Sequence, residues 1–138
     1  MENKNIPITS EQSDRLIQAA KTVLTNAYAP YSQFQVGAAV LTKQGNIFTG
    51  CNVENVSYGL SICAERNAIA SAVAAEGGSN LEVVAIAIAN NRQIPCSPCG
   101  ACRQVIQELG TKSIVIFQDS SGWQTTEIDK LLPQSFSF

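Results

Sequence analysis

Three cysteines lie at equal spacing in the stretch PCSPCGAC, residues 95–102: Cys96, Cys99 and Cys102. A thiolate can bind a soft metal ion or take part in redox exchange, whereas an inert buried thiol only packs. The chain contains no histidine, which is the commonest metal ligand in proteins. If this stretch holds a metal ion, further ligands must therefore come from other residue types elsewhere in the chain.

The residues around the cysteines predict which two of them act as a pair. Ser97 and Pro98 are typical of a helix start, with Ser97 as the N-cap and Pro98 in the first helical position. Cys99 and Cys102 would then lie on one face of the first turns, near the positive end of the helix dipole, which favours thiolates. Cys96 precedes the cap and is expected to point elsewhere.

A catalytic zinc site takes three protein ligands and keeps one position for water. Cys51 and Cys63 are the remaining cysteines. Cys63 also stands near the start of a predicted helix. The helix–strand–helix order that follows it places the two helix starts side by side on one face of a parallel sheet. We therefore expect Cys63, Cys99 and Cys102 to converge on one Zn²⁺ per chain.

Charged residues near these cysteines suit hydrolytic chemistry. Glu65 follows Cys63 by two residues, so its carboxylate could reach the open position of the metal without being a ligand. A carboxylate there can move the protons of a water activated by the metal. Arg66 and Arg103 lie close to ligands in the sequence. Hydrogen bonds from them to the sulfurs would offset the negative charge of three thiolates.

Hydrophobic periodicity predicts the elements that position these residues. Helices are expected over residues 10–27, 61–78, 100–110 and 128–133. Strands are expected over 34–42 and 46–53 as a hairpin, over 81–90 and 113–117 as buried strands, and over 121–127 as a pairing segment. This order indicates one α/β domain over residues 1–138, with a sheet covered by helices.

Composition and charge narrow the partners and the location. The chain has 138 residues, 45% of them hydrophobic and 14% charged, with a net charge of −2. Its basic residues are scattered, whereas a polynucleotide partner needs a concentrated positive patch. No segment approaches the roughly 20 apolar residues of a membrane span, and the start MENKNIPITSEQ has no signal-peptide core. An odd number of cysteines indicates a reducing compartment. We expect a cytoplasmic protein that binds neither nucleic acid nor membrane.

Taken together, the motifs resemble a known family. CAE at residues 63–65 followed by PCGAC at 98–102 is similar to the signature of zinc deaminases. The segments AYAPYSQFQVGAAV, GCNVENVSY, CAERNAIA, SPCGACRQV and LLPQSF resemble, in order and spacing, the small homotetrameric cytidine deaminases. The resemblance implies a three-layer α-β-α sandwich with a mixed five-stranded sheet. It also implies hydrolytic deamination of free cytidine and 2′-deoxycytidine, as in pyrimidine salvage.

The resemblance further implies roles for single residues. It makes Cys63, Cys99 and Cys102 the zinc ligands, Glu65 the proton shuttle, and Arg66 a donor to ligand sulfurs. The implied substrate contacts are Asn52 and Glu54 for the ribose hydroxyls, Phe34 for the pyrimidine, the backbone of Ala64 for the base, and Tyr58 and Phe136 for sites completed across subunits of a homotetramer. Cys96 is no ligand in the family pattern, and Cys51 and Cys96 are left as packing thiols.

Other interpretations remain open. Cys99 and Cys102 alone would also suit a structural zinc knuckle or a redox pair, although a thioredoxin-like pair lacks a distant third cysteine with an adjacent acid. The chain could deaminate another aminopyrimidine compound, such as a nucleoside antibiotic or a polynucleotide base. It could also be a zinc-stabilised module without activity, against which Glu65 is the main observation.

Overall fold

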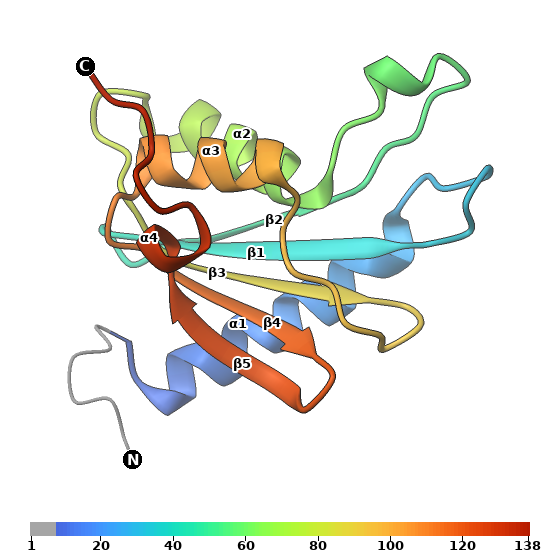
Figure 1. Ribbon diagram of the computed structural model, residues 1–138, viewed down its shortest axis with the longest axis horizontal. Helices are drawn as coiled ribbons and strands as arrows, with labels where there is room; N and C mark the ends of the chain where they lie inside the picture. Colours follow the sequence, from blue (N-terminus) through green and yellow to red (C-terminus); the bar gives the residue numbers. More distant parts are fainter. Residues whose placement is uncertain (1–7) are drawn as a thin grey trace.

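The computed structural model describes residues 8–138; the first seven residues, part of the stretch that shows no signal-peptide core, lie outside this range. Five strands form one sheet in the order β2-β1-β3-β4-β5 (Figure 1). They are β1 (Val36–Thr42), β2 (Ile47–Cys51), β3 (Val83–Asn90), β4 (Ile114–Asp119) and β5 (Gly122–Glu127). β3 and β4 are parallel and the other neighbouring strands are antiparallel, so the sheet is mixed, as predicted.

Helices cover both faces of this sheet. They are α1 (Ser10–Val23), α2 (Ala64–Glu76), α3 (Gly100–Leu109), α4 (Ile128–Leu131) and the short 3₁₀ helices η1 (Leu24–Asn26) and η2 (Tyr58–Leu60). In Figure 1, α1 lies against one face, while α2 and α3 lie against the other. The core divides in the same way, since Ala20 of α1 belongs to one cluster and Ile69 of α2 and Ile106 of α3 belong to another. The predicted α-β-α sandwich is confirmed.

The first helix begins at a capping box. The Thr9 hydroxyl accepts a hydrogen bond from the Gln12 N–H at 3.1 Å, and the Gln12 side chain accepts one from the Thr9 N–H at 2.9 Å. These reciprocal bonds satisfy two backbone donors that otherwise lack partners. The predicted helix over 10–27 is confirmed, with its last turn tightened into η1. Within residues 8–138, no helix has both the length and the apolar composition to cross a membrane.

Two glycines bring helices to backbone contact with the sheet. A Cβ atom added at Gly37 of β1 would overlap the carbonyl oxygen of Ala20 in α1. One added at Gly50 of β2 would overlap the backbone nitrogen of Ala68 in α2. The absence of a side chain at both positions therefore permits close packing. At Gly50, this packing draws the first turns of α2 toward the end of β2.

The predicted strands are confirmed as well. β1 and β2 form the antiparallel hairpin, and Gly45 turns it with a φ of 90°. β3 is buried along nearly its whole length, as expected for a strand covered on both faces. The segment from Gly122 to Glu127 pairs antiparallel with β4.

Candidate active site

Two cysteines occupy equivalent positions at the starts of neighbouring helices. Cys63 is the N-cap of α2, with a ψ of 154°, and Cys99 is the N-cap of α3, with a ψ of 167°. Neither side chain makes a capping hydrogen bond, so both sulfurs remain available as ligands. The prediction of Ser97 as the cap and Pro98 as the first helical residue was wrong, because the chain stays extended through Cys99.

Three thiols converge between these helix starts. Cys102 lies in the first turn of α3 and is fully buried. The sulfurs of Cys63, Cys99 and Cys102 lie within 4.8 Å of one another, and those of Cys63 and Cys99 are 3.9 Å apart. Zinc with tetrahedral Zn–S bonds of about 2.3 Å holds its sulfurs about 3.8 Å apart. The predicted cluster therefore fits one zinc ion per chain.

Electrostatics in the cluster favour thiolates. Arg66 Nη2 donates a hydrogen bond to Cys63 Sγ at 3.4 Å. Hydrogen bonds from the Cys102 thiol and from Arg66 lower the pKa of Cys63 to about 5, against the opposing effect of burial. The contact with Cys63 in turn raises the pKa of Cys102. The pair therefore favours a thiolate at Cys63 beside a thiol at Cys102, and a bound zinc ion would replace the remaining thiol proton because zinc binds thiolates.

Glu65 is buried beside the cluster. It is the second residue of α2 and only 5% exposed. Burial raises the pKa of its carboxyl group, and the Cys63 thiolate raises it further, while a hydrogen bond from Cys102 partly opposes the rise. A carboxyl group with a raised pKa next to a metal site can both accept and deliver a proton near neutral pH.

Arg103 makes different contacts from those predicted. Its guanidinium donates to three oxygens: Nε to the Pro98 carbonyl at 2.7 Å, Nη1 to the Leu131 carbonyl at 2.9 Å and Nη2 to the Ser97 hydroxyl at 3.1 Å. Arg103 therefore binds the turn before Cys99 and the end of α4, whereas Arg66 is the arginine that reaches a sulfur.

The other two cysteines lie outside the cluster. Cys96 is half-buried against the core between the sheet and α2, and burial raises the pKa of its thiol to about 11. Its N–H donates to the Gln118 carbonyl at 2.9 Å. Cys51 ends β2, and its carbonyl accepts a hydrogen bond from Asn67 Nδ2 at 2.8 Å. Both positions are consistent with packing thiols.

Asn52 and Glu54, the residues expected to bind ribose, follow β2 and form hydrogen bonds with the loop that precedes β1. Asn52 accepts a hydrogen bond from the Val36 N–H at 2.8 Å and donates to the Phe34 carbonyl at 2.9 Å. Val53 pairs with Ile62 through backbone hydrogen bonds of 3.0 and 2.9 Å. Because Ile62 directly precedes Cys63, the segment around Asn52 lies beside the start of α2.

Glu54 is held by the loop that leads into β1. One carboxylate oxygen accepts from the N–H groups of Tyr31 and Ser32 at 3.0 and 3.2 Å, and the other accepts from the Ser32 hydroxyl. The hydrogen bond from that hydroxyl lowers the pKa of Glu54. Its carboxylate is thus oriented and ionised at the mouth of a cavity of about 330 Å³ that Tyr31 and Tyr58 also line.

The two residues expected to contact the base differ in exposure. Phe34 is partly buried and packs against the core cluster, and Arg92 lies over its ring at 5.4 Å. Ala64 is fully buried in the first turn of α2, between Cys63 and Glu65 in the sequence. The cluster that Phe34 packs against includes residues of α2 and α3, and Ala64 belongs to α2 itself.

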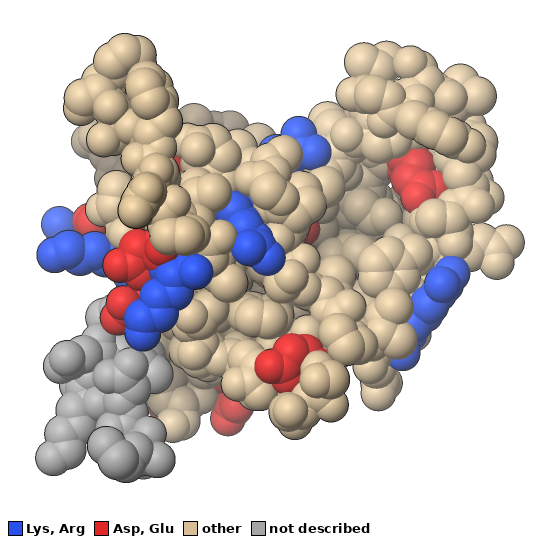
Figure 2. Space-filling view, viewed as in Figure 1, with Lys and Arg blue, Asp and Glu red and all other residues tan. Residues whose placement is uncertain are grey.

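Tyr58 and Phe136 are both highly exposed, at 77% and 73%. Tyr58 packs edge-on against Tyr31, and Phe136 packs edge-on against Phe138. The segment with Tyr58 and the C-terminal segment rise at opposite ends of the molecule (Figure 1). The face between them is hollowed (Figure 2). The structure therefore does not bring these two side chains together within one chain.

Sequence reasoning missed Ser32 and Arg92. The Ser32 hydroxyl binds Glu54, 22 residues away, and accepts from the Phe34 N–H at 3.0 Å. Arg92 Nη2 donates to the Ser32 carbonyl at 3.0 Å, across 60 residues. No local sequence pattern predicts these contacts, because their partners are 22 and 60 residues apart. Ser32 itself looks like an ordinary loop serine close to Pro30.

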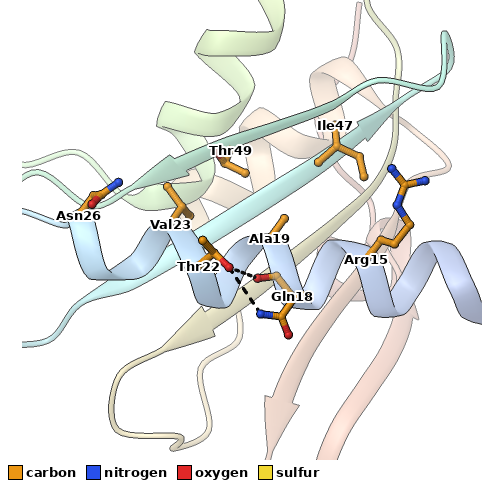
Figure 3. Close-up of a pocket in the computed structure, with 8 residues that line it drawn as sticks. All are labelled: Arg15, Gln18, Ala19, Thr22, Val23, Asn26, Ile47 and Thr49. Atoms are coloured by element: carbon orange, nitrogen blue, oxygen red, sulfur yellow. Dashed lines mark hydrogen bonds between the residues drawn. The ribbon is translucent and has the colours of Figure 1, made fainter.

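A second groove is separate from this site. It runs between α1 and β2, and Figure 3 shows the exposed side chain of Arg15 at one end and Asn26 at the other. None of the predicted site residues lines it.

The fold and the site together define a class of protein: an α/β sandwich in which two helix starts hold a three-thiol zinc centre beside a buried carboxylate. Residues 10–118 match the family model of the cytidine and deoxycytidylate deaminase zinc-binding region, and the chain belongs to this family. The predicted family and the predicted enzyme class, a zinc-dependent hydrolase of the deaminase type, are thereby confirmed.

Similar proteins agree with this assignment. A cytidine deaminase of Halalkalibacterium halodurans is 44% identical over 124 residues, covering 88% of this chain and 92% of that protein. One from Sporosarcina psychrophila is 41% identical over 126 residues and 90% of each chain. The crystal structure of cytidine deaminase from Burkholderia pseudomallei matches with a TM-score of 0.80 and 46% identity, over 94% of this chain and all of that one.

Proposed function

We propose that this chain hydrolyses free cytidine and 2′-deoxycytidine to uridine and 2′-deoxyuridine, with release of ammonia, in pyrimidine salvage. The observation that carries the proposal is the buried carboxyl of Glu65, which lies in the first turn of α2, two residues after Cys63, and interacts with the Cys102 thiol of α3. A structural zinc site has four protein ligands and no bound water, so a neighbouring carboxyl would have no proton to transfer there. The relatives named cytidine deaminase support cytidine as the substrate.

The roles in the reaction follow from the geometry of the cluster. Cys63, Cys99 and Cys102 would hold the zinc ion, which when bound supplies a Lewis acid that activates water. Glu65 accepts a proton from the attacking water and delivers it to N3 of the ring. The same carboxylate then takes the second proton of that water from the oxygen now bound to C4 and carries it to the amino group, and the C4–N bond breaks as ammonia leaves. Its raised pKa suits both directions of transfer.

Binding of a free nucleoside is assigned to the two adjoining loops. Glu54 is ionised and oriented by Ser32, so it can accept hydrogen bonds from ribose hydroxyls. Asn52 lies next to it and fixes the backbone of Phe34, whose ring we assign to the pyrimidine. The backbone of Ala64 is assigned to the base, because it lies in the same helical turn as Glu65.

Assembly into a homotetramer is part of the proposal. Large apolar side chains are exposed along the segment before α2: Val53, Val56, Tyr58, Leu60 and Ile62. Contiguous exposure of this kind is typical of a protein–protein interface. Tyr58 and Phe136 would then each complete the site of a neighbouring subunit, which accounts for their exposure in the single chain.

A nucleoside fits the charge of the molecule better than a polynucleotide does. On the face in Figure 2, basic side chains are interspersed with acidic ones and form no continuous patch. All five cysteines are free thiols, which supports a cytoplasmic location. One sheet with one pair of core clusters supports our proposal that residues 1–138 act as a single catalytic domain.

The direct test is incubation of the zinc-loaded protein with cytidine, 2′-deoxycytidine, cytosine, cytidine monophosphate and a cytosine-containing single-stranded oligonucleotide. We expect ammonia and loss of the cytosine absorbance with the two nucleosides. Release of ammonia mainly from another of these compounds would transfer the assignment to that substrate. No ammonia from any of them, with about one zinc per chain verified, would leave a zinc-stabilised module without activity.

A further inference from the structure

The side chain of Arg103 joins two parts of the chain that are distant in sequence. Its three hydrogen bonds reach the carbonyl of Pro98 and the hydroxyl of Ser97 on one side, and the carbonyl of Leu131, 28 residues away, on the other. An arginine can make this arrangement because its planar guanidinium presents several donors in fixed directions. A lysine ammonium has no such fork.

The first of these parts is the turn that places Cys99. Cys102 is buried and Cys63 is half-buried, whereas Cys99 is exposed. Burial therefore does little to fix the Cys99 sulfur, and the conformation of the preceding turn must do so. Within that turn, Pro98 is fully buried and its carbonyl receives the shortest of the three Arg103 bonds, at 2.7 Å.

The second part is the root of the C-terminal segment. Leu131 is the last residue of α4, and its side chain packs against the core. A carbonyl at a helix end lacks an intrahelical partner, and a cationic donor there is favourable. The chain leaves α4 at Leu132, turns at Gln134 with a φ of 53° and then carries Phe136 outward. The bond from Arg103 therefore holds the last residue before this departure.

We propose that Arg103 is a positioning residue that couples the metal-ligand turn at Cys99 to the C-terminal segment that carries Phe136. Loss of the arginine loosens a zinc ligand and, at the same time, the segment assigned to a neighbouring subunit's nucleoside site. The effect on the metal stands without the proposed function, whereas the effect on nucleoside binding rests on it.

The test compares Arg103→Lys and Arg103→Met with the control Arg15→Met, which alters an exposed arginine on α1 away from the site (Figure 3). Zinc release from the loaded protein to a chromogenic chelator is measured under conditions where all variants are folded. Supporting partners of metal ligands typically contribute 10- to 100-fold in affinity. We expect both Arg103 variants to release zinc about 10-fold faster or more, and the control to match the wild type. Should Arg103→Met fail to fold, Arg103→Lys retains the charge and gives the answer.

Two further measurements separate coupling from general destabilisation. Hydrogen exchange at the end of α4, where the Leu132 N–H donates to the Ile128 carbonyl, should accelerate in Arg103→Lys and not in Arg15→Met. For turnover of cytidine, Arg103→Lys should raise KM more than it lowers kcat. That rise should be largely absent when the chain is also truncated after Pro133, because both changes act on the same segment.

The outcomes distinguish the two proposals. Zinc release and C-terminal exchange at wild-type rates in a folded Arg103→Lys protein would overturn the positioning role, as would additive effects of Arg103→Lys and the truncation on KM. If the wild-type protein binds zinc but leaves cytidine unchanged, the proposed function fails. The zinc-release and exchange results still decide the role of Arg103.

Discussion

Cys63 and Cys99 hold the same N-cap position on two neighbouring helices, with their sulfurs 3.9 Å apart. Serine, threonine, asparagine and aspartate are the usual residues at this position, because their side chains bind free backbone N–H groups. Here two thiols take that place without making capping bonds. Because both helices direct their positive ends at the cluster, they stabilise thiolates there.

Replacement of single cysteines should separate ligands from packing thiols. Cys99→Ser removes one of three sulfurs within 4.8 Å of each other, so we expect loss of bound zinc and lower thermal stability. Cys96→Ser is the matched control, since its thiol lies outside the cluster, and it should keep about one zinc per chain. Metal analysis of both purified variants decides this. Retained zinc in Cys99→Ser together with its loss in Cys96→Ser would contradict the assigned ligands.

Removal of the Arg66 side chain should weaken the metal centre without abolishing it. In the metal-free protein, Arg66→Gln loses a donor that lowers the pKa of Cys63, so this pKa rises above about 5. Less thiolate is then expected between pH 5 and the ordinary thiol pKa of 9.0, measurable from thiolate absorbance. Zinc affinity should fall about 10- to 100-fold. An unchanged thiolate titration would show that the Arg66–Cys63 contact is not formed in solution.

Much of this architecture is predictable from local sequence patterns. The amphipathic repeat of α1, the hairpin around Gly45 and the continuous apolar run of β3 each reflect a period that burial imposes on a helix or a strand. Convergence of Cys63 and Cys99 is predictable too, because helices that flank β3 on the same face start at the same edge of the sheet.

Other features depend on contacts that no local pattern encodes. The prediction of Ser97 as a helix cap used local preference alone, whereas in the structure its hydroxyl accepts a hydrogen bond from Arg103. The predicted bond from Arg103 to sulfur failed for a related reason, since the competing acceptor at Leu131 lies 28 residues away. The bond between Ser32 and Glu54 likewise needs the folded loops.

The exposed apolar segment before α2 predicts the state of assembly. Val56 and Leu60 are 76% and 65% exposed in the single chain. Aspartate at both positions would place charges in an interface core, so the double variant Val56→Asp/Leu60→Asp should sediment as a smaller species than the proposed tetramer. The control Arg15→Met should keep the wild-type mass. If the wild-type protein sedimented as a monomer, Tyr58 and Phe136 could not complete the nucleoside site of a neighbouring subunit.

The C-terminal segment predicts cooperation between subunits. Truncation after Pro133 removes Phe136, whose burial in an assembled site would contribute ~1.5–3 kcal/mol. A loss of that size corresponds to a nucleoside affinity about 10- to 100-fold lower. Phe136→Leu is the milder companion variant and should retain part of the affinity. Isothermal titration with a non-hydrolysable cytidine analogue measures both.

Mixed assemblies test whether the segment acts on a neighbour. Glu65→Gln subunits with an intact C-terminus, co-assembled with truncated subunits, should restore activity to the truncated partners' sites. Each parent protein alone should be weakly active. Verified mixed tetramers without any gain over the parents would show that Phe136 serves only its own chain.

Glu65 is the proton carrier of the proposed zinc-dependent deamination, and the kcat of zinc-loaded Glu65→Gln with cytidine measures this role. Glutamine keeps the size of the side chain and can still form hydrogen bonds, but it cannot accept a proton from water. We predict unchanged zinc content and a kcat ~10²- to 10⁴-fold below wild type. A loss beyond that of one general acid–base step is expected because the same carboxyl serves several proton transfers. Turnover close to the wild-type rate in a variant with about one zinc per chain would show that Glu65 does not carry the protons.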